Sequence, residues 1–318
     1  MATATTPQTT DPATAPGPPE ITVVIPVFND PEHLALCLDA LREQTLDPAR
    51  FDVLVVDDGS DEPIDALIAR YDRVRLIRTD DEVGGSYAAR NRAIAATAAP
   101  ILAFTDADCV PRPDWLACGL HALDAADHDA LVAGDIELFY PPGRPINGAQ
   151  VFDRVTAFPQ REYVELDRFA VTANLFVPRR VFDRVGRFDG SAMSGGDREF
   201  GRRATDAGVR LVFEPAAVVD HPTRGDAAVL RAKWRRVARG VERIRRENPD
   251  APEARRAGLW RSFRPRLRFM AGIVADRSLG PLSARLSACW LVVQHRPMAW
   301  YYARQARRLS DRDIIGRG

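Results

Sequence analysis

The chain lacks any apolar run long enough to cross a membrane. A membrane-spanning helix needs roughly 20 apolar residues in a row, and the longest candidate, Leu286 to Val293, is far shorter. Residues 1–18 contain almost only Ala, Thr and Pro, which predicts a disordered leader. They have neither the basic start nor the apolar core of a secretory signal. We therefore expect a cytoplasmic protein, with association at the inner face of the plasma membrane as an open alternative.

Cysteine is scarce, and its positions show neither metal-site spacing nor a disulfide framework, as expected in a reducing compartment. They are Cys37, Cys109, Cys118 and Cys289. The length of 318 residues allows one large domain, or one domain with a smaller module. The 46% hydrophobic content is ordinary for a globular protein with a sizeable core.

The formal net charge of zero hides an asymmetry along the chain. From His221 onward there are 23 basic and 8 acidic residues, and the first 220 residues carry the opposite excess. A basic C-terminal region favours an anionic partner such as a lipid headgroup or an acidic glycan. The chain has no nucleic-acid-binding motif, so we expect no nucleic-acid partner.

The first 105 residues predict four buried strands that alternate with three helices. Such alternation is typical of right-handed βαβ units and a parallel sheet. The expected strands cover 21–27, 51–56, 74–77 and 101–105. One helix is expected after Asp30, a second over 64–71 and a third from Gly85 through Ala98. In these sheets ligands bind beyond the carboxyl ends of the strands. The segments at those ends are 26–29, 57–60 and 106–109.

The second half of the chain shows a looser pattern. It predicts helices over 114–123, 178–185 and 197–207, strands over 131–138, 172–177 and 209–213, and a loop over 140–148. Arg-rich helical patterns follow from Ala227. We therefore divide the chain into a leader (1–18), a main α/β domain (19–225) and a basic, mainly helical extension (226–318).

Asp106 and Asp108 stand at the end of the buried strand 101–105. Two carboxylates so close together are costly to leave unpaired, and a hard divalent cation that carries phosphate oxygens would remove that cost. The alternative is an exposed turn, because Asp also favours turns.

Seven segments together resemble family 2 glycosyltransferases in their order and spacing. They are 23–29, 56–60, 88–91, 106–108, 173–177, 185–189 and 195–199. The resemblance covers about residues 20–222. It implies the GT-A fold, an α/β architecture with a mixed, mostly parallel sheet flanked by helices and a Rossmann-like nucleotide-binding half, here followed by the helical extension.

The resemblance also implies an activity. The expected reaction transfers a sugar, with inversion, from a nucleotide sugar to a hydroxyl of a glycan, glycolipid or small molecule. A UDP-sugar is the first expectation for the donor. The implied cofactor is Mn²⁺ or Mg²⁺. The chain lacks the Gln-x-x-Arg-Trp motif and the membrane helices of the family's processive synthases, so we expect a non-processive enzyme. Lys233, Arg236 or Arg239 could still reach the donor diphosphate.

The resemblance assigns roles to individual residues. The implied metal ligands are Asp108, Asp106 and His221. The implied donor-binding residues are Pro26, Val27, Asn29, Asp58, Arg90 and Asp106. Asp197 is the expected general base, with Glu199 as a fallback and with a pKa lowered by the helix dipole. Asp197 could instead cap its helix, Arg90 could be a surface residue, and His221 could be a capping or core residue. Asp220, next to His221, is a weaker candidate for the metal ligand.

Two other functions remain open from the residues alone. A sugar nucleotidyltransferase would also use an α/β half and acidic metal ligands, although its Gly-rich basic loop is missing at 26–29. A catalytically silent glycan-binding protein of the same fold is the other alternative. The aromatic residues of the extension either pack on the main domain or lie in a membrane interface; they include Trp234, Trp260, Phe263, Phe269, Trp290, Trp300, Tyr301 and Tyr302.

Overall fold

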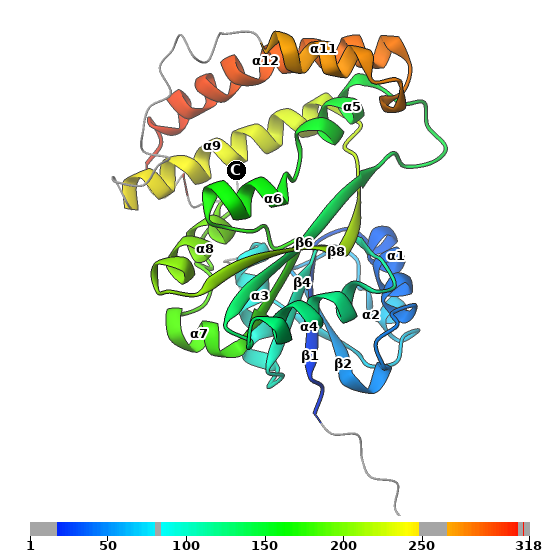
Figure 1. The fold of residues 1–318 in the computed structure, drawn as a ribbon, viewed down its shortest axis with the longest axis vertical. Helices are drawn as coiled ribbons and strands as arrows, with labels where there is room; N and C mark the ends of the chain where they lie inside the picture. The colour runs from blue at the N-terminus through cyan, green and yellow to red at the C-terminus, as the bar shows by residue number, and fades with distance from the viewer. Residues whose placement is uncertain (1–17, 80–83, 248–265, 311–313, 315–318) are drawn as a thin grey trace, which may run out of the picture.

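The computed structural model describes residues 18–79, 84–247, 266–310 and 314. It contains an eight-stranded sheet with helices on both faces and a helical layer across one end (Figure 1). The strand order is β3-β2-β1-β4-β7-β6-β8-β5.

The first half confirms the predicted alternation of strands and helices. Its four strands are parallel, and Ile21 of β1 pairs with both Phe51 of β2 and Ile101 of β4. The elements are β1 (Ile21–Val27), α1 (Pro31–Arg42), η1 (Pro48–Arg50), β2 (Phe51–Asp57), α2 (Asp65–Ile68), β3 (Val74–Arg78), α3 (Ser86–Ala96) and β4 (Ile101–Thr105). Asp30 caps α1 by accepting a hydrogen bond from the His33 backbone N–H. Only α2 is much shorter than predicted.

The second half makes the sheet mixed, because β7 runs antiparallel to both of its neighbours, β4 and β6. The elements are β5 (Val110–Pro111), α4 (Trp115–Ala125), β6 (Ala130–Phe139), α5 (Gly148–Thr156), α6 (Gln160–Glu162), the π-helical η2 (Tyr163–Asp167), β7 (Asn174–Pro178), α7 (Arg179–Val185), α8 (Gly196–Asp206) and β8 (Arg210–Pro222). The short elements β5, α5, α6 and η2 were not predicted.

The expected end of the last strand at Phe213 is wrong, because β8 continues to Pro222. Its pairing with β6 shifts at Gly134 and Asp135, where Gly134 pairs with Glu214 and Asp135 with Val218. The polar and small residues of this bulge interrupt the apolar run and hide the second half of the strand from the sequence pattern. That second half carries His221.

Asn174 holds this bulge from the first position of β7. Its side chain is fully buried and donates to the backbone oxygens of Asp135 and Ala217 at 2.7 and 2.9 Å. The Trp115 indole N–H donates to the side-chain oxygen of Asn174 at 2.8 Å. A side chain at Gly134 would lie 2.1 Å from the Ala217 oxygen, so only glycine fits there.

The two faces of the sheet are covered by separate apolar clusters. One packs β1, β2 and β4 against α1 and α4, and includes Leu34, Leu38 and Trp115. The other packs the opposite face against α3, α7 and α8, and includes Phe104 and Phe200. Because both faces are covered, the strands read as continuous apolar runs in the sequence.

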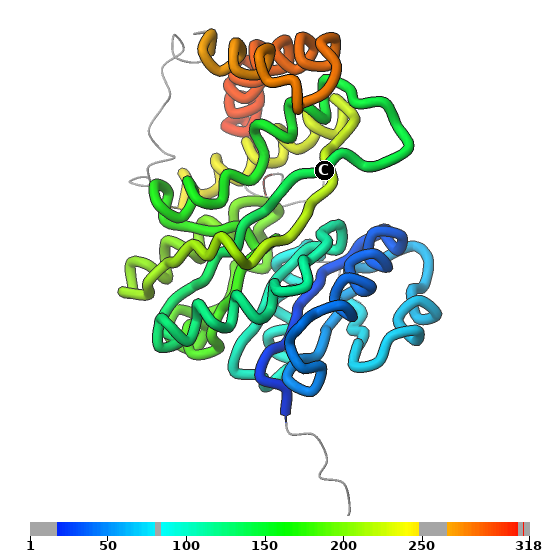
Figure 2. The backbone as a smooth tube through the Cα atoms, turned by 45° about the vertical axis from the view of Figure 1, so that its right-hand side comes forward, coloured from blue at the N-terminus to red at the C-terminus, as the bar shows by residue number. Residues whose placement is uncertain are grey.

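The C-terminal helices form a third apolar cluster together with α5. The elements are α9 (Ala227–Glu247), α11 (Leu267–Ala275), η4 (Arg277–Leu279) and α12 (Leu282–Ala306). Figures 1 and 2 show α11 and α12 as the outermost layer, with α9 between them and the main domain. Trp234 and Tyr302 are buried in the cluster, whereas Trp290 and Tyr301 are exposed. Trp260 and Phe263 lie outside the described residues.

Within the described residues, none of the helices combines the length and apolar character that a membrane crossing requires.

Candidate active site

A cavity of about 820 Å³ lies at the carboxyl ends of β1, β2 and β4, where the sequence predicts a ligand site. The loops after these strands form its floor, and α9 and α12 form its outer wall. Of the predicted residues it is lined by Pro26, Val27, Asp58, Arg90, Asp106, Asp108, Asp197, Lys233 and Arg236.

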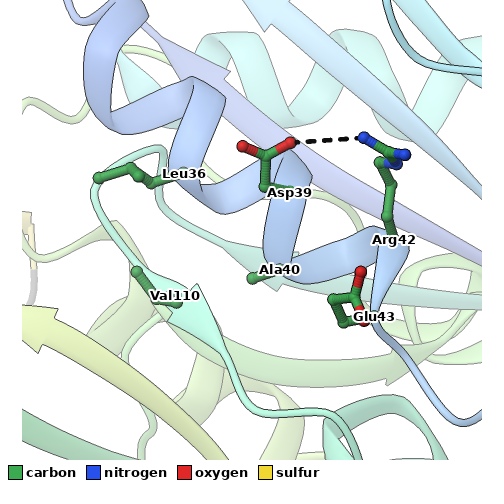
Figure 3. Close-up of a pocket in the computed structure, with 6 residues that line it drawn as sticks. All are labelled: Leu36, Asp39, Ala40, Arg42, Glu43 and Val110. Atoms are coloured by element: carbon green, nitrogen blue, oxygen red, sulfur yellow. Dashed lines mark ion pairs between the residues drawn. The ribbon is translucent and has the colours of Figure 1, made fainter.

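A second hollow lies beside α1 (Figure 3). It is lined by Leu36, Asp39, Ala40, Arg42, Glu43 and Val110, and Asp39 pairs with Arg42 at 3.7 Å. It contains none of the predicted site residues and has no convergent polar groups beyond this exposed ion pair. The chemistry is therefore concentrated in the larger cavity.

Asp108 lines this cavity, and His221, distant from it in sequence, lies buried directly behind it. The short strand β5, directly after Asp108, pairs with β8, and Val110 lies opposite Asp220. This pairing brings the His221 Nε2 atom to 3.3 Å from Asp108 Oδ2. The His221 Nδ1 atom lies 2.7 Å from the backbone oxygen of Pro222, which can only accept, so Nδ1 carries the proton. Burial lowers the pKa of His221, which favours the neutral ring with an acceptor lone pair on Nε2.

The Asp108 and His221 pair fits a divalent cation. A neutral imidazole nitrogen and a carboxylate oxygen that face each other are both acceptors, and a cation between them satisfies both. Cys109 lies close enough to offer a third ligand atom, which its sequence spacing did not suggest. Burial and the carboxylates of Asp108 and Asp106 raise the pKa of the Cys109 thiol well above its usual value. A protonated thiol is a poor ligand, so the oxygen and nitrogen atoms define the site.

Asp106 forms an ion pair with Arg90, whose side chain is 2% exposed. Arg90 comes from α3 and also lies over the Tyr87 ring, with 5.6 Å between its guanidinium carbon and the ring centroid. The alternative that Arg90 is a surface residue is wrong. Its guanidinium orients Asp106 and holds positive charge at the cavity wall.

Asp58 lines the cavity and ties together the loops around it. One carboxylate oxygen accepts from the Gly85 backbone N–H at 2.7 Å, and the other accepts from the Thr79 hydroxyl at 3.3 Å. Asn29 does not line the cavity. Its side chain donates to Asp61 at 2.8 Å and accepts from the Asp61 backbone at 2.8 Å, which joins the loops after β1 and β2.

Asp197 is the second residue of α8 and lines the cavity across from the Asp106–Asp108 loop. The helix is capped by Gly195, so Asp197 is free of that role. Burial raises the pKa of Asp197 above its usual value, although hydrogen bonds from the Arg198 N–H and from Tyr87 oppose this. The predicted lowering of this pKa by the helix dipole is therefore wrong in sign, because desolvation is the larger effect.

The weaker candidates Glu199, Asp220 and Arg239 do not line the cavity. Glu199 forms an ion pair with Arg203 at 2.7 Å, one turn along α8, and does not line the cavity. Asp220 accepts from Arg112 at 2.8 and 3.0 Å on the far side of β8 from His221. Arg239 is also absent from the cavity lining.

The structure contains a buried charged cluster around Asp153 of α5 that the sequence did not predict. Asp153, 1% exposed, lies 3.2 Å from Arg224 and 3.6 Å from Lys233. Arg224 also lies 3.5 Å from His221 Nε2, so the cluster adjoins the candidate metal site. Burial lowers the pKa of Lys233 to about 8, and Arg224 adds to the effect. No local motif marks Asp153, whose partners are distant in sequence.

The wall of the cavity near Asp197 is apolar. It consists of side chains from α9 and α12, namely Trp234, Val237, Val241, Ile244, Ala299 and Ala303. Helix α9 approaches the loop before α8 closely, since a side chain at Gly240 would lie 2.5 Å from the Ser194 oxygen. The cavity thus combines charged groups from the strand ends with an apolar wall from α9 and α12.

Comparisons with known proteins agree with this geometry. Residues 22–184 match the profile described as "Glycosyl transferase family 2". The chain is 37% identical over 221 residues to the glycosyltransferase AglE of Haloferax volcanii, covering 68% of this chain and 71% of AglE. It is 31% identical over 220 residues to the pre-mycofactocin glycosyltransferase of Mycobacterium tuberculosis, covering 67% of this chain but only 45% of that protein.

A solved structure extends the likeness to the whole fold. The mannosyltransferase PcManGT from Pyrobaculum calidifontis, in complex with GDP-Man and Mn²⁺, aligns with a TM-score of 0.62 over 94% of this chain and 91% of that one, at 18% identity. The fold is therefore the GT-A fold, and the protein is a glycosyltransferase. This chain belongs to glycosyl transferase family 2. Membership excludes a sugar nucleotidyltransferase, and the named glycosyltransferase relatives support an enzyme rather than a silent glycan-binding protein of the same fold.

Proposed function

We propose that this enzyme transfers a sugar from a nucleotide-sugar donor to an acceptor hydroxyl, with inversion and with a divalent cation. The observation that carries the proposal is the facing pair of His221 Nε2 and Asp108 Oδ2, 3.3 Å apart, beside the cavity that Asp108 and Asp197 both line. One side of that cavity suits a cation and a diphosphate, and the other offers a carboxylate for proton transfer.

Asp108 and His221 would hold the cation, Mn²⁺ or Mg²⁺, with Asp106 beside them. When bound, the cation neutralises the diphosphate and the charge that develops on the departing nucleotide. The likeness to PcManGT, whose own complex contains Mn²⁺, supports this choice. Arg90 keeps Asp106 oriented toward the donor. Lys233 and Arg236, which line the same cavity, supply further positive charge to the diphosphate.

Asp197 would act as the general base. Inversion requires a carboxylate that accepts the proton of the acceptor hydroxyl while its oxygen attacks the anomeric carbon. A pKa raised by burial makes the Asp197 carboxylate a stronger base than that of an exposed Asp. Glu199 is held by Arg203 outside the cavity, so Asp197 is the better candidate.

The donor nucleotide would lie over the ends of β1 and β2. Pro26, Val27 and Asp58 line that part of the cavity, and Asp58 is the acceptor for the base or ribose. Asn29 supports this region from behind through its contacts with Asp61. A UDP-sugar stays our prediction for the donor; the GDP-Man in PcManGT makes a GDP-sugar the first competitor to test.

We also propose that the enzyme is non-processive and acts in the cytoplasm. Residues 226–318 would serve as an extension of the catalytic domain, since α9 and α12 complete the wall of its cavity.

The decisive experiment is a panel of UDP-, GDP- and dTDP-sugars titrated calorimetrically with Mn²⁺, with Mg²⁺ and with a chelator. We expect one donor to bind with metal and to lose binding in the chelator. If no nucleotide sugar binds in the presence of metal, the proposal fails.

A further inference from the structure

Helix α12 carries an exposed apolar stripe on its outer side. Its members follow one another at helical spacing, and each is between 41% and 62% exposed. They are Leu282, Leu286, Trp290, Val293 and Tyr301. We refer to these five side chains as the α12 stripe. Side chains of this size gathered on one helix face indicate a surface that is covered when the protein works.

The region around the stripe is strongly basic. Residues 266–310 contain eight arginines, of which Arg285 is buried, and a single acidic residue, Asp276. Arg304 follows the stripe at its C-terminal end, and its guanidinium carbon lies 5.7 Å from the centroid of the Trp300 ring. Arginine beside Trp and Tyr at the edge of an apolar helix face is the arrangement that suits a lipid interface.

The stripe has a defined position relative to the active site. Figures 1 and 2 show α12 in the outermost layer, away from the sheet. The opposite side of the same helix lines the cavity through His295, Ala299 and Ala303. One helix therefore separates the cavity from the exposed stripe, a thickness of about 10 Å.

We propose that the α12 stripe and its surrounding arginines dock this enzyme on the surface of an anionic lipid bilayer. The apolar side chains enter the boundary between headgroups and acyl chains, and the arginines contact anionic headgroups. This is a peripheral contact. A symmetric pairing of two copies through the stripe is disfavoured, because it would bring the same basic surfaces together. The inference does not depend on the proposed reaction.

The test measures co-sedimentation of the full chain with vesicles. One set contains phosphatidylcholine alone, and the other an equal mixture of phosphatidylcholine and phosphatidylglycerol. We expect binding to the mixed vesicles that weakens as salt is added. The double variant Leu286→Ser with Trp290→Ser should bind roughly tenfold more weakly or worse. Arg304→Gln should weaken binding about fivefold.

Two matched variants control for the chemistry of these changes. Leu36→Ser removes a leucine of nearly equal exposure, 55% against 53%, on the far helix α1. Arg70→Gln removes an exposed arginine that lies over Tyr71 as Arg304 lies over Trp300. Both controls should bind vesicles like the wild type. All variants should keep the wild-type melting temperature and metal-dependent donor binding, which separates this test from that of the proposed function.

Three results would overturn the proposal. They are the absence of binding to anionic vesicles, equal binding by the double variant, and a shift from dimer to monomer in size-exclusion chromatography when the stripe is changed. The last would assign the stripe to contact between copies.

Discussion

The His221 Nε2 atom lies 3.3 Å from Asp108 Oδ2, and the His221 Nδ1–H is committed to the backbone oxygen of Pro222. Two acceptors brought so close favour a positive charge beside them, and the Arg224 guanidinium lies 3.5 Å from Nε2. A bound divalent cation would contact both acceptors. The same pair therefore defines the test of metal binding.

Asp108→Asn should abolish metal-dependent donor binding while the fold is kept. The amide has the size of the carboxylate but lacks its charge, and loss of a ligand should weaken metal affinity about a hundredfold or more. Calorimetry with Mn²⁺ and the donor measures this. Asp220→Asn is the matched control, since Asp220 pairs with Arg112 away from the cavity. Equal loss in both variants would contradict the assignment.

Asp197→Asn should remove transfer and spare donor binding. Loss of the base should lower kcat by about a hundredfold or more, while the donor dissociation constant stays at the wild-type value. Glu199→Gln provides the comparison, because Glu199 contacts Arg203 rather than the cavity. If Asp197→Asn retains wild-type kcat, another group must accept the proton.

Lys233 should produce a basic limb in the pH profile of kcat/KM. Its pKa is lowered to about 8 by burial, so the ammonium is charged below that pH and becomes neutral above it. Support of the diphosphate is therefore present at low pH and lost as the pH rises through about 8. Lys233→Arg keeps its charge at every accessible pH and should move the limb upward. A limb that stays in place would assign it to another group.

Asn174→Ala should destabilise the protein strongly. It leaves the Trp115 N–H and the backbone oxygens of Asp135 and Ala217 buried without partners, at a total cost of about 3 kcal/mol or more. Asn147→Ala removes the cap of α5 and one exposed hydrogen bond to the Gly225 backbone oxygen, and should cost about 1 kcal/mol. Thermal unfolding compares the two, and equal melting temperatures would contradict the role of Asn174 in the bulge.

The nucleotide-binding half could be predicted well because its signals are local. Strands buried on both faces give apolar runs such as 21–27 and 101–105, and Asp30 with Pro31 marks the start of α1. The carboxyl ends of parallel strands meet at one edge, so the positions of Asp58, Asp106 and Asp108 followed from the strand assignments.

The rest of the site depends on contacts between distant segments. The approach of Cys109 to His221 depends on the pairing of β5 with β8. Strand β5 has only two residues, which is too short to give a recognisable sequence pattern. Asp153 lies on a helix that was not predicted, and its partners come from β8's end and α9. The pKa of Asp197 is set by burial rather than by its own helix, so the direction of its shift could not be predicted from its position in the sequence.

The pairing of Val110 with Asp220 makes the active site sensitive to insertions and deletions in the second half of β8. Side chains on a strand alternate between faces, so a one-residue insertion or deletion between Val218 and Asp220 would turn His221 away from Asp108. Substitutions along β8 can conserve the alternation, but a change of length cannot. We expect natural and engineered insertions to be accepted in the loop before α5 and to inactivate the enzyme within β8.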